Sequence, residues 1–178
     1  MANNGLLGNA LVVPDVTGII WTGRPRQYRS DCQLGKFKIG SDKLVGKELK
    51  MEIFGFRTID DELFGYEYQT WLQVLFIDPQ NVVSSILFKT ESMDNFANLQ
   101  VDLLTQGRAI GEGVVTATMA KRSSNAGKGY FAVEFSWTER EDGERLLEIG
   151  QFVSGLSIEQ FALPSGGGNG DVMEVKAE

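Results

Sequence analysis

The chain has 178 residues, of which 42% are hydrophobic and 23% charged, and its net charge is −7. It is long enough to bury a core as one domain, and no run approaches the roughly 18 consecutive apolar residues that a membrane helix needs. It has no histidine and one cysteine, which excludes Ser-His-Asp and Cys-His catalysis, most zinc sites and an intrachain disulfide.

The first residues, MANNGLLGNALVVPD, carry no cationic segment before their apolar residues, which is not the pattern of a signal peptide. Together with the lone Cys32, this indicates a cytoplasmic protein without a membrane partner. No nucleophile lies in a pattern that pairs it with a base. We therefore expect a protein that is not an enzyme and that needs no cofactor or metal.

Residues 1–30 contain glycines and prolines that interrupt any helix, and we interpret them as an N-terminal arm packed partly on the body. The end of the arm, WTGRPRQYR, interleaves aromatic residues with Arg24, Arg26 and Arg29, a composition that stacks bases and binds phosphates. From residue 21 to residue 50 the sequence has eight cations and only three anions. This surplus suits an anion-binding face, and it equally suits a solvated sheet edge protected by lysines.

Two segments with alternating character follow, over residues 34–39 and 50–57. Their apolar positions predict the inward faces of two strands, and Gly55 indicates a bulge or bend in the second. The outward positions carry cations and aromatic rings, namely Lys36, Lys38, Lys50, Phe54 and Phe56.

The third predicted strand covers residues 71–77. Its uniformly apolar alternate positions begin at Leu72 and define the inward face, so Trp71 and Gln73 are expected to point outward. An Asp-Pro-Gln-Asn turn then returns the chain as another strand over residues 82–89.

One helix is predicted, over residues 92–104. Ser92 is suited to the N-cap, Phe96 and Leu103 recur at helical spacing, and Gly107 follows as a C-terminal stop.

Residues 111–139 read as a strand, a basic glycine-serine loop and a second strand. Alternate positions of the second strand form one apolar face made of Phe131, Val133, Phe135 and Trp137. The loop is expected to be exposed and cationic, with Lys121, Arg122 and Lys128 around it and Tyr130 at its exit.

Residues 146–153 are predicted as a further strand that completes a domain over residues 31–163. The remaining segment, 164–178, is rich in glycine and mildly acidic, and we expect it to be a disordered tail.

This order of elements predicts a mainly β fold, a small antiparallel Greek-key barrel with one helix between its third and fourth strands. The arrangement resembles the OB-fold over roughly residues 34–153. The resemblance implies that a ligand binds on the face of strands two and three and at the loops that join strands one to two and four to five. Another antiparallel sandwich or barrel, with the helix closing one end, is the competing fold.

The layout also resembles that of bacterial single-stranded-DNA-binding proteins, in which a glycine-rich linker leads to an acidic tail. Here the chain ends in Val-Lys-Ala-Glu instead of their acidic residues followed by Pro-Phe, so recruitment of partners by the tail is not implied. The segments YQTWLQVLFID, ILFKTES and NF resemble uncharacterised proteins encoded by cyanobacteria and their plasmids or phages, a likeness that assigns no activity.

We therefore expect a non-catalytic protein that binds single-stranded nucleic acid, DNA more readily than RNA, and that forms a homo-oligomer. The residues expected to stack bases are Phe54, Phe56, Trp71 and Tyr130, and those expected to bind phosphates are Lys36, Lys38, Lys50, Lys121, Arg122 and Lys128, with Arg24, Arg26 and Arg29. Each aromatic residue could instead pack inside the protein. The alternative is an assembly or scaffold protein that uses the same aromatic face between subunits; a carbohydrate-binding barrel would leave the cations unexplained.

Overall fold

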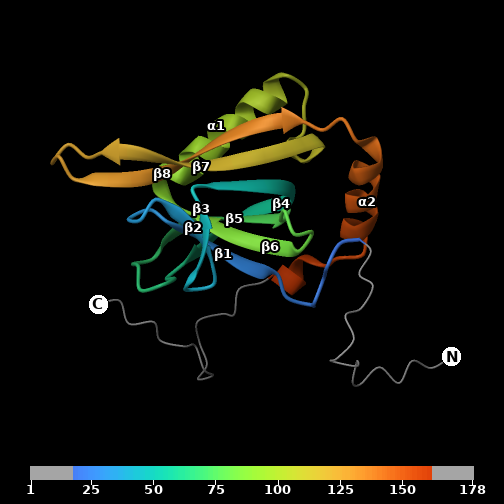
Figure 1. Ribbon diagram of the computed structural model, residues 1–178, viewed down its shortest axis with the longest axis horizontal. Helices are drawn as coiled ribbons and strands as arrows, with labels where there is room; N and C mark the ends of the chain where they lie inside the picture. The colour runs from blue at the N-terminus through green and yellow to red at the C-terminus, as the bar shows by residue number, and fades with distance from the viewer. Residues whose placement is uncertain (1–17, 162–178) are drawn as a thin grey trace.

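The computed structural model describes residues 18–161 of the chain (Figure 1). Within this range it has eight strands and two α-helices, with one short 3-10 helix before β7 and another at the end. In chain order the elements are β1 (Arg26–Asp31), β2 (Lys36–Ile39), β3 (Lys43–Gly46), β4 (Glu48–Asp61), β5 (Gln69–Ile77), β6 (Val83–Phe88), α1 (Thr90–Thr105), η1 (Ile110–Glu112), β7 (Gly113–Ser123), β8 (Gly129–Glu139), α2 (Gly143–Ser154) and η2 (Ile158–Phe161).

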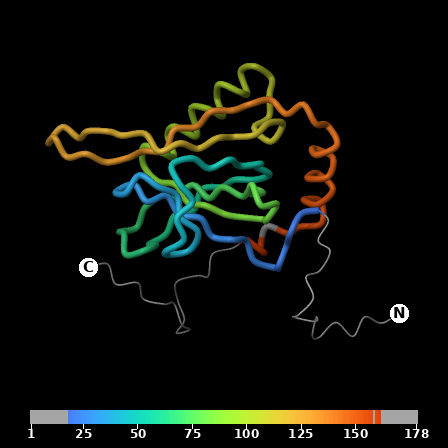
Figure 2. Tube along the Cα trace, viewed as in Figure 1, coloured from blue at the N-terminus to red at the C-terminus, as the bar shows by residue number. Residues whose placement is uncertain are grey.

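The strands form one curled sheet in the order β3-β2-β1-β6-β5-β4-β7-β8 (Figure 1). The mainly β prediction is confirmed, but the sheet is mixed, because β1 pairs with β6 in parallel while the other pairs are antiparallel. The curl brings the β1–β2 turn close to β8, where the backbone N–H of Phe131 donates to the carbonyl of Cys32 at 2.9 Å. The β7–β8 hairpin continues beyond this contact and projects from the body (Figure 2).

The concave side of the sheet holds the main core, which includes Phe37, Met51, Val74, Phe76 and Val115. Helix α1 closes this core with its buried Phe96 and Leu103. The apolar faces predicted for the β7–β8 hairpin and for the strand at residues 71–77 both lie in this core, so those predictions are confirmed.

Helix α1 begins two residues before the predicted N-cap, and Ser92 has a different role from the expected one. The Ser92 hydroxyl accepts a hydrogen bond from the backbone N–H of Val133 at 3.0 Å, and the Asn95 side chain donates to the Val133 carbonyl at 2.9 Å. Two helix side chains thus satisfy the backbone of β8 on the side away from β7. Gly107 follows the helix with a φ of 70°, which confirms the predicted stop.

Strand β4 contains the bulge predicted at Gly55. Ile53 pairs with Phe76 and Gly55 pairs with Leu75, so Phe54 is the extra residue. The extra residue reverses the alternation, and Phe54 and Phe56 therefore lie on opposite faces of the sheet. The prediction that both point outward was wrong for this reason.

A second layer covers the convex side of β4, β5 and β6, and we call it the outer layer. Its apolar residues are Leu75, Val83 and Phe161, packed with Ile19, Trp21, Phe54, Phe152 and Leu156. Because β5 is covered on both faces, Gln73 is fully buried and Trp71 is only 4% exposed. The prediction that these two side chains reach solvent was wrong.

Residues 146–153, predicted as a strand, belong to helix α2, so the described chain has two helices instead of one. Asp142 caps the helix by accepting from the backbone N–H groups of Glu144 and Arg145 at 3.0 and 3.3 Å. Ile149 is buried and Phe152 packs in the outer layer three residues later, which is helical spacing. The charged run before this segment therefore starts a helix.

The last residues of the predicted N-terminal arm form most of β1, so the sheet starts earlier than the expected domain boundary. The earlier arm residues up to 17, and the predicted tail at 164–178, lie outside the described residues. Between residues 18 and 161, no helix is long and apolar enough to cross a membrane.

Candidate nucleic-acid interface

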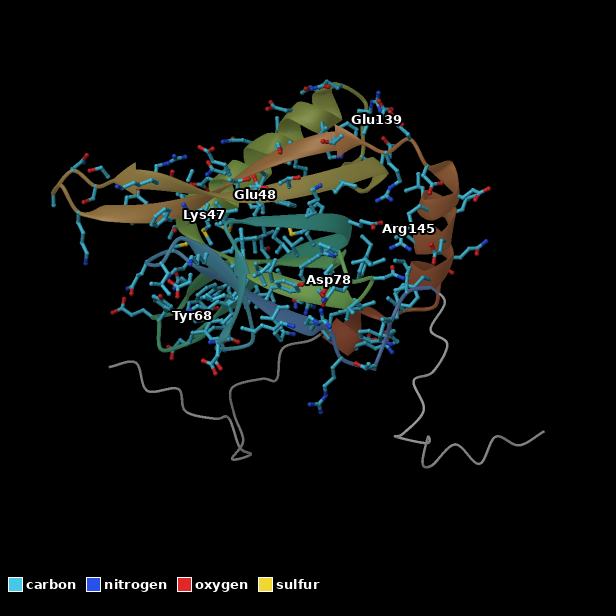
Figure 3. All side chains as sticks on the ribbon, in the orientation of Figure 1. Lys47, Glu48, Tyr68, Asp78, Glu139 and Arg145 are labelled. Atoms are coloured by element: carbon cyan, nitrogen blue, oxygen red, sulfur yellow. The ribbon has the colours of Figure 1, made fainter. Side chains whose placement is uncertain are left out.

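Exposed aromatic rings gather at one end of the molecule, which we call the aromatic end. It consists of the β4–β5 loop at residues 62–68, Arg29 on β1, the β6–α1 junction and the β7–β8 hairpin. The β4–β5 loop, the β6–α1 junction and the hairpin lie on the left side of the ribbon in Figure 1, and Tyr68 is labelled there in Figure 3. Arg29 belongs to the same end because its guanidinium contacts the Phe64 ring. The exposed rings are those of Phe64, Tyr66, Tyr68 and Tyr130.

The buried ring of Trp71 supports the β4–β5 loop. The rings of Phe64 and Tyr66 contact it edge-on at centroid distances of 5.8 and 5.7 Å. The Trp71 indole N–H also donates to the carbonyl of Asp61 at 3.2 Å, at the start of the loop. Trp71 therefore supports the exposed rings from below, and its own ring is not free to stack on a base.

Two cations lie over these loop rings. The Arg29 guanidinium is 5.0 Å from the ring centre of Phe64, and the Lys89 ammonium is 3.0 Å from that of Tyr66. Such contacts favour one loop conformation and place positive charge beside each ring. Neither cation forms an ion pair within the described residues.

A carboxylate ties the base of the β7–β8 hairpin to α1. Glu91 accepts from the Arg122 Nε at 2.7 Å and from the Tyr130 hydroxyl at 2.8 Å, and Arg122 also donates to Glu134 at 2.6 Å. Both hydrogen bonds lower the pKa of the Glu91 carboxyl, and the bond from Arg122 has a larger effect than the bond from the Tyr130 hydroxyl. The carboxylates of Glu134 and Glu91 in turn raise the pKa of Arg122. Arg122, predicted to bind phosphate, is already engaged by two anions and positions the hairpin instead.

The tip of the hairpin is a tight turn with free cations. The Ser124 backbone N–H donates to the Lys128 carbonyl at 2.9 Å, and Gly127 takes a φ of 77°, which a side chain would strain. Lys121 and Lys128 are exposed and form no ion pair in the described range. Both are available to an anionic ligand, as predicted.

The other predicted phosphate contacts are scattered. Lys38 forms an ion pair with Asp31 at 2.6 Å, and Arg26 forms one with the buried Asp78 at 3.0 Å. The remaining three make no ion pair in the part of the chain that the structure describes; Arg24 and Lys50 are exposed and Lys36 is partly buried.

The predicted stacking residues are also divided between three places. Phe54 packs in the outer layer, with its ring centre 5.9 Å from that of Phe161. Phe56 lies at the surface, but its ring contacts Phe96 of α1 edge-on at 5.4 Å. Only Tyr130 has the exposure expected of it at the aromatic end.

The sequence reasoning missed four residues of the aromatic end, Phe64, Tyr66, Tyr68 and Lys89. The run FGYEY, with an aromatic residue at every second position between the strands predicted at 50–57 and 71–77, was the available signal. Glu62 and Glu67 are exposed in the same loop, and Glu67 lies between Tyr66 and Tyr68 in the sequence, so the loop carries both signs of charge.

Among residues 18–161, no group of three histidine, cysteine or acidic side chains is placed to hold a metal ion. Comparisons of the chain with known protein families, curated proteins and solved structures found no match.

Proposed function

We propose that this chain is a non-catalytic protein that binds single-stranded nucleic acid, DNA in preference to RNA, at the aromatic end. The observation that carries the proposal is the set of exposed rings and cations at the aromatic end. Phe64 and Tyr66 lie under Arg29 and Lys89, Tyr68 is exposed in the same loop, and the hairpin exposes Tyr130, Lys121 and Lys128. None of these four cations forms an ion pair within residues 18–161.

Single strands offer what such a surface can bind. Every base has a π-face that stacks on an aromatic side chain, and every nucleotide carries a phosphate that a lysine or arginine attracts. Tyr68 is 67% exposed and has no ring partner in the described residues, so its face is open to a base. A duplex hides these faces, and the surface would therefore prefer single strands.

The order of the strands supports an OB-like core for this function. The run β6-β5-β4-β7-β8 has α1 between β6 and β7, and the long, bulged β4 pairs first with β7 and then with β5. With β4, β5 and β6 as barrel strands one to three, the β4–β5 and β7–β8 loops take the positions from which OB-folds contact ligands. In this assignment the first barrel strand is β4, whereas residues 34–39 were expected to form it. Strands β1, β2 and β3 then extend the sheet beyond β6.

The experiment is a fluorescence-anisotropy titration of labelled oligo-dT of about 30 nucleotides, at low and moderate salt, with duplex DNA and single-stranded RNA as competitors. We expect the affinity for oligo-dT to fall as salt rises, because phosphate neutralisation releases counterions. Duplex DNA should displace the bound oligo-dT poorly. Absence of binding at low salt, where electrostatic attraction is strongest, would reject the proposal.

A second candidate function, self-assembly, is favoured by a different observation. The sheet ends in β3, which pairs only with β2 in the described chain and exposes Leu44 and Val45. An apolar edge strand is a template for pairing with another chain. Light scattering of the wild-type protein and of Leu44→Lys tests it: an oligomer that the substitution dissociates supports assembly through β3, and a wild-type monomer rejects it. The interface expected from the sequence is unsuited to this role because Phe54 and Trp71 pack within the chain.

A further inference from the structure

Phe161, at the end of η2, occupies a site on the convex side of the sheet. Its ring lies between Trp21, at a centroid distance of 5.3 Å, and Phe54, at 5.9 Å. It packs over Leu75 and Val83 and is buried. One residue thus fills a gap between two aromatic rings above the sheet.

The same residue satisfies polar groups that the sheet presents at this place. The Phe161 carbonyl accepts from the Arg57 guanidinium at 2.9 Å and from the Gln73 carboxamide at 3.2 Å. Arg57 also donates to the Gln73 side-chain oxygen at 2.7 Å, and Gln73 donates to Ser85 at 3.2 Å. Gln73 and Ser85 are completely buried under this cover. Because the Arg57 and Gln73 donors are directed at one oxygen, this site favours an occupant that carries a hydrogen-bond acceptor. A purely apolar group would leave the donors without a partner.

Besides Phe161, the segment that follows α2 contributes Leu156 to the outer layer. Between the end of α2 and Phe161, the chain forms one turn of 3-10 helix, and Gly155, Ser157, Glu159 and Gln160 are exposed. Segments with few buried apolar contacts open at a small fraction of the cost of global unfolding. We therefore expect this segment, with Phe161, to open before the sheet and α2 unfold.

The site adjoins the aromatic end. Trp71 and Gln73 lie on the same face of β5, two residues or about 7 Å apart along the strand. Trp71 supports the exposed loop rings, and Gln73 lies under Phe161. A strand that is bound at the aromatic end would therefore need to extend by about 7 Å along β5 to reach this site.

We propose that Phe161 is a built-in occupant of a base-binding site, and that a nucleobase bearing a carbonyl group displaces it when single-stranded nucleic acid binds. The base would take the place of the Phe161 ring, with its face toward Trp21 and its edge toward Phe54, and its carbonyl oxygen would accept from Arg57 and Gln73. Thymine, cytosine and guanine have such an oxygen, and adenine has none. The inference rests on the proposed function, since it extends the bound strand from the aromatic end.

The test compares the binding of labelled oligo-dT and oligo-dA of about 12 nucleotides to the wild-type protein and to Phe161→Ala. Phe161→Ala keeps the backbone carbonyl that accepts from Arg57 and Gln73 but removes the ring that holds it over the sheet, so the site should open more readily. We therefore expect Phe161→Ala to bind oligo-dT about fivefold to tenfold more tightly and oligo-dA with a much smaller gain. Adding Arg57→Met should abolish the gain for oligo-dT. The matched control is Phe152→Ala, which removes another ring from the outer layer but leaves the Phe161 ring in place and should give no gain.

Hydrogen exchange on the wild-type protein decides the question even if Phe161→Ala does not fold. The Gln160 amide bonds to the Ser157 carbonyl at 3.1 Å, so it reports whether η2 is formed. We expect saturating oligo-dT to accelerate its exchange. If the wild-type protein binds oligo-dT while this exchange stays the same or slows, the displacement is wrong and the proposed function stands. If neither protein binds either oligonucleotide, both proposals fail.

Discussion

The aromatic end and the outer layer contain the same kinds of side chain, but the rings of the outer layer are covered by another segment of the chain. Both combine aromatic rings with cations next to one face of β5, where Trp71 serves the first and Gln73 the second. At the aromatic end the rings of Phe64, Tyr66 and Tyr68 face solvent, whereas in the outer layer Phe54 and Trp21 pack against Phe161. Composition alone therefore does not distinguish a binding surface from a packing layer; the position of other segments of the chain does.

Replacement of Trp71 by alanine should have the largest effect, and the effect should be on stability. The ring is 4% exposed and supports two loop rings, so we expect a loss of about 3–5 kcal/mol in the free energy of unfolding. Chemical denaturation measures it. A loss below about 0.5 kcal/mol, the usual range for a surface substitution, would mean that Trp71 is a surface residue, as the alternation alone suggested.

Replacement of Tyr68 by alanine should do the reverse. We expect little change in the free energy of unfolding, because the side chain is 67% exposed. The affinity for oligo-dT should fall roughly 5-fold to 100-fold, because stacking contributes about 1–3 kcal/mol per base. Leu147→Ala on α2 is the matched control, since Leu147 is also 67% exposed but lies on a different element. Equal affinities for the two variants would remove Tyr68 from the binding surface.

Substitutions in the hairpin compare Lys128, which forms no ion pair within the described residues, with Arg122, which forms two. Lys128→Gln should reduce the slope of log affinity against log salt by about one, the value for a single lost phosphate contact. Arg122→Gln should change this slope less, because Glu91 and Glu134 already neutralise the guanidinium. Salt titrations of both variants measure the difference. A larger change in slope for Arg122→Gln would show that its ion pairs open on binding.

Acidification should have the smallest effect, confined to the base of the hairpin. The folded state lowers the pKa of Glu91, so its bonds to Arg122 and Tyr130 stabilise the hairpin above the ordinary glutamate value of 4.5 and are lost as the pH falls below it. Because the group is exposed, we expect a local loosening and no global unfolding. Ring signals of Tyr130 in NMR spectra should report the transition, and Glu91→Gln should remove it. A transition that persists in Glu91→Gln would assign it to another carboxyl group.

Alternation within each strand predicted much of the fold. The inward faces of β5, β7 and β8, the bulge at Gly55 and the stop at Gly107 follow from local rules of side-chain period and backbone conformation. These rules act within a few residues, so the sequence is sufficient to apply them.

Exposure could not be predicted in the same way, because it depends on distant segments. Trp71 is covered by the β4–β5 loop and Gln73 by a residue 88 positions away in sequence. Residues 146–153 were predicted as a strand but belong to helix α2, because a short apolar run fits either kind of element. The candidate site was therefore predicted only in part: the hairpin lysines and Tyr130 are where they were expected, and the loop rings were missed.

Photo-crosslinking tests the central claim, that single strands stack on the aromatic end, most directly. Iododeoxyuridine placed in an oligo-dT strand forms a covalent bond with an aromatic side chain that it stacks on, and mass spectrometry then locates the bond. We predict crosslinks at Tyr66, Tyr68 or Tyr130, lost when duplex replaces the single strand. Crosslinks confined to residues outside the aromatic end and its neighbouring site at Trp21 and Phe54, or equal yields with duplex, would contradict the claim.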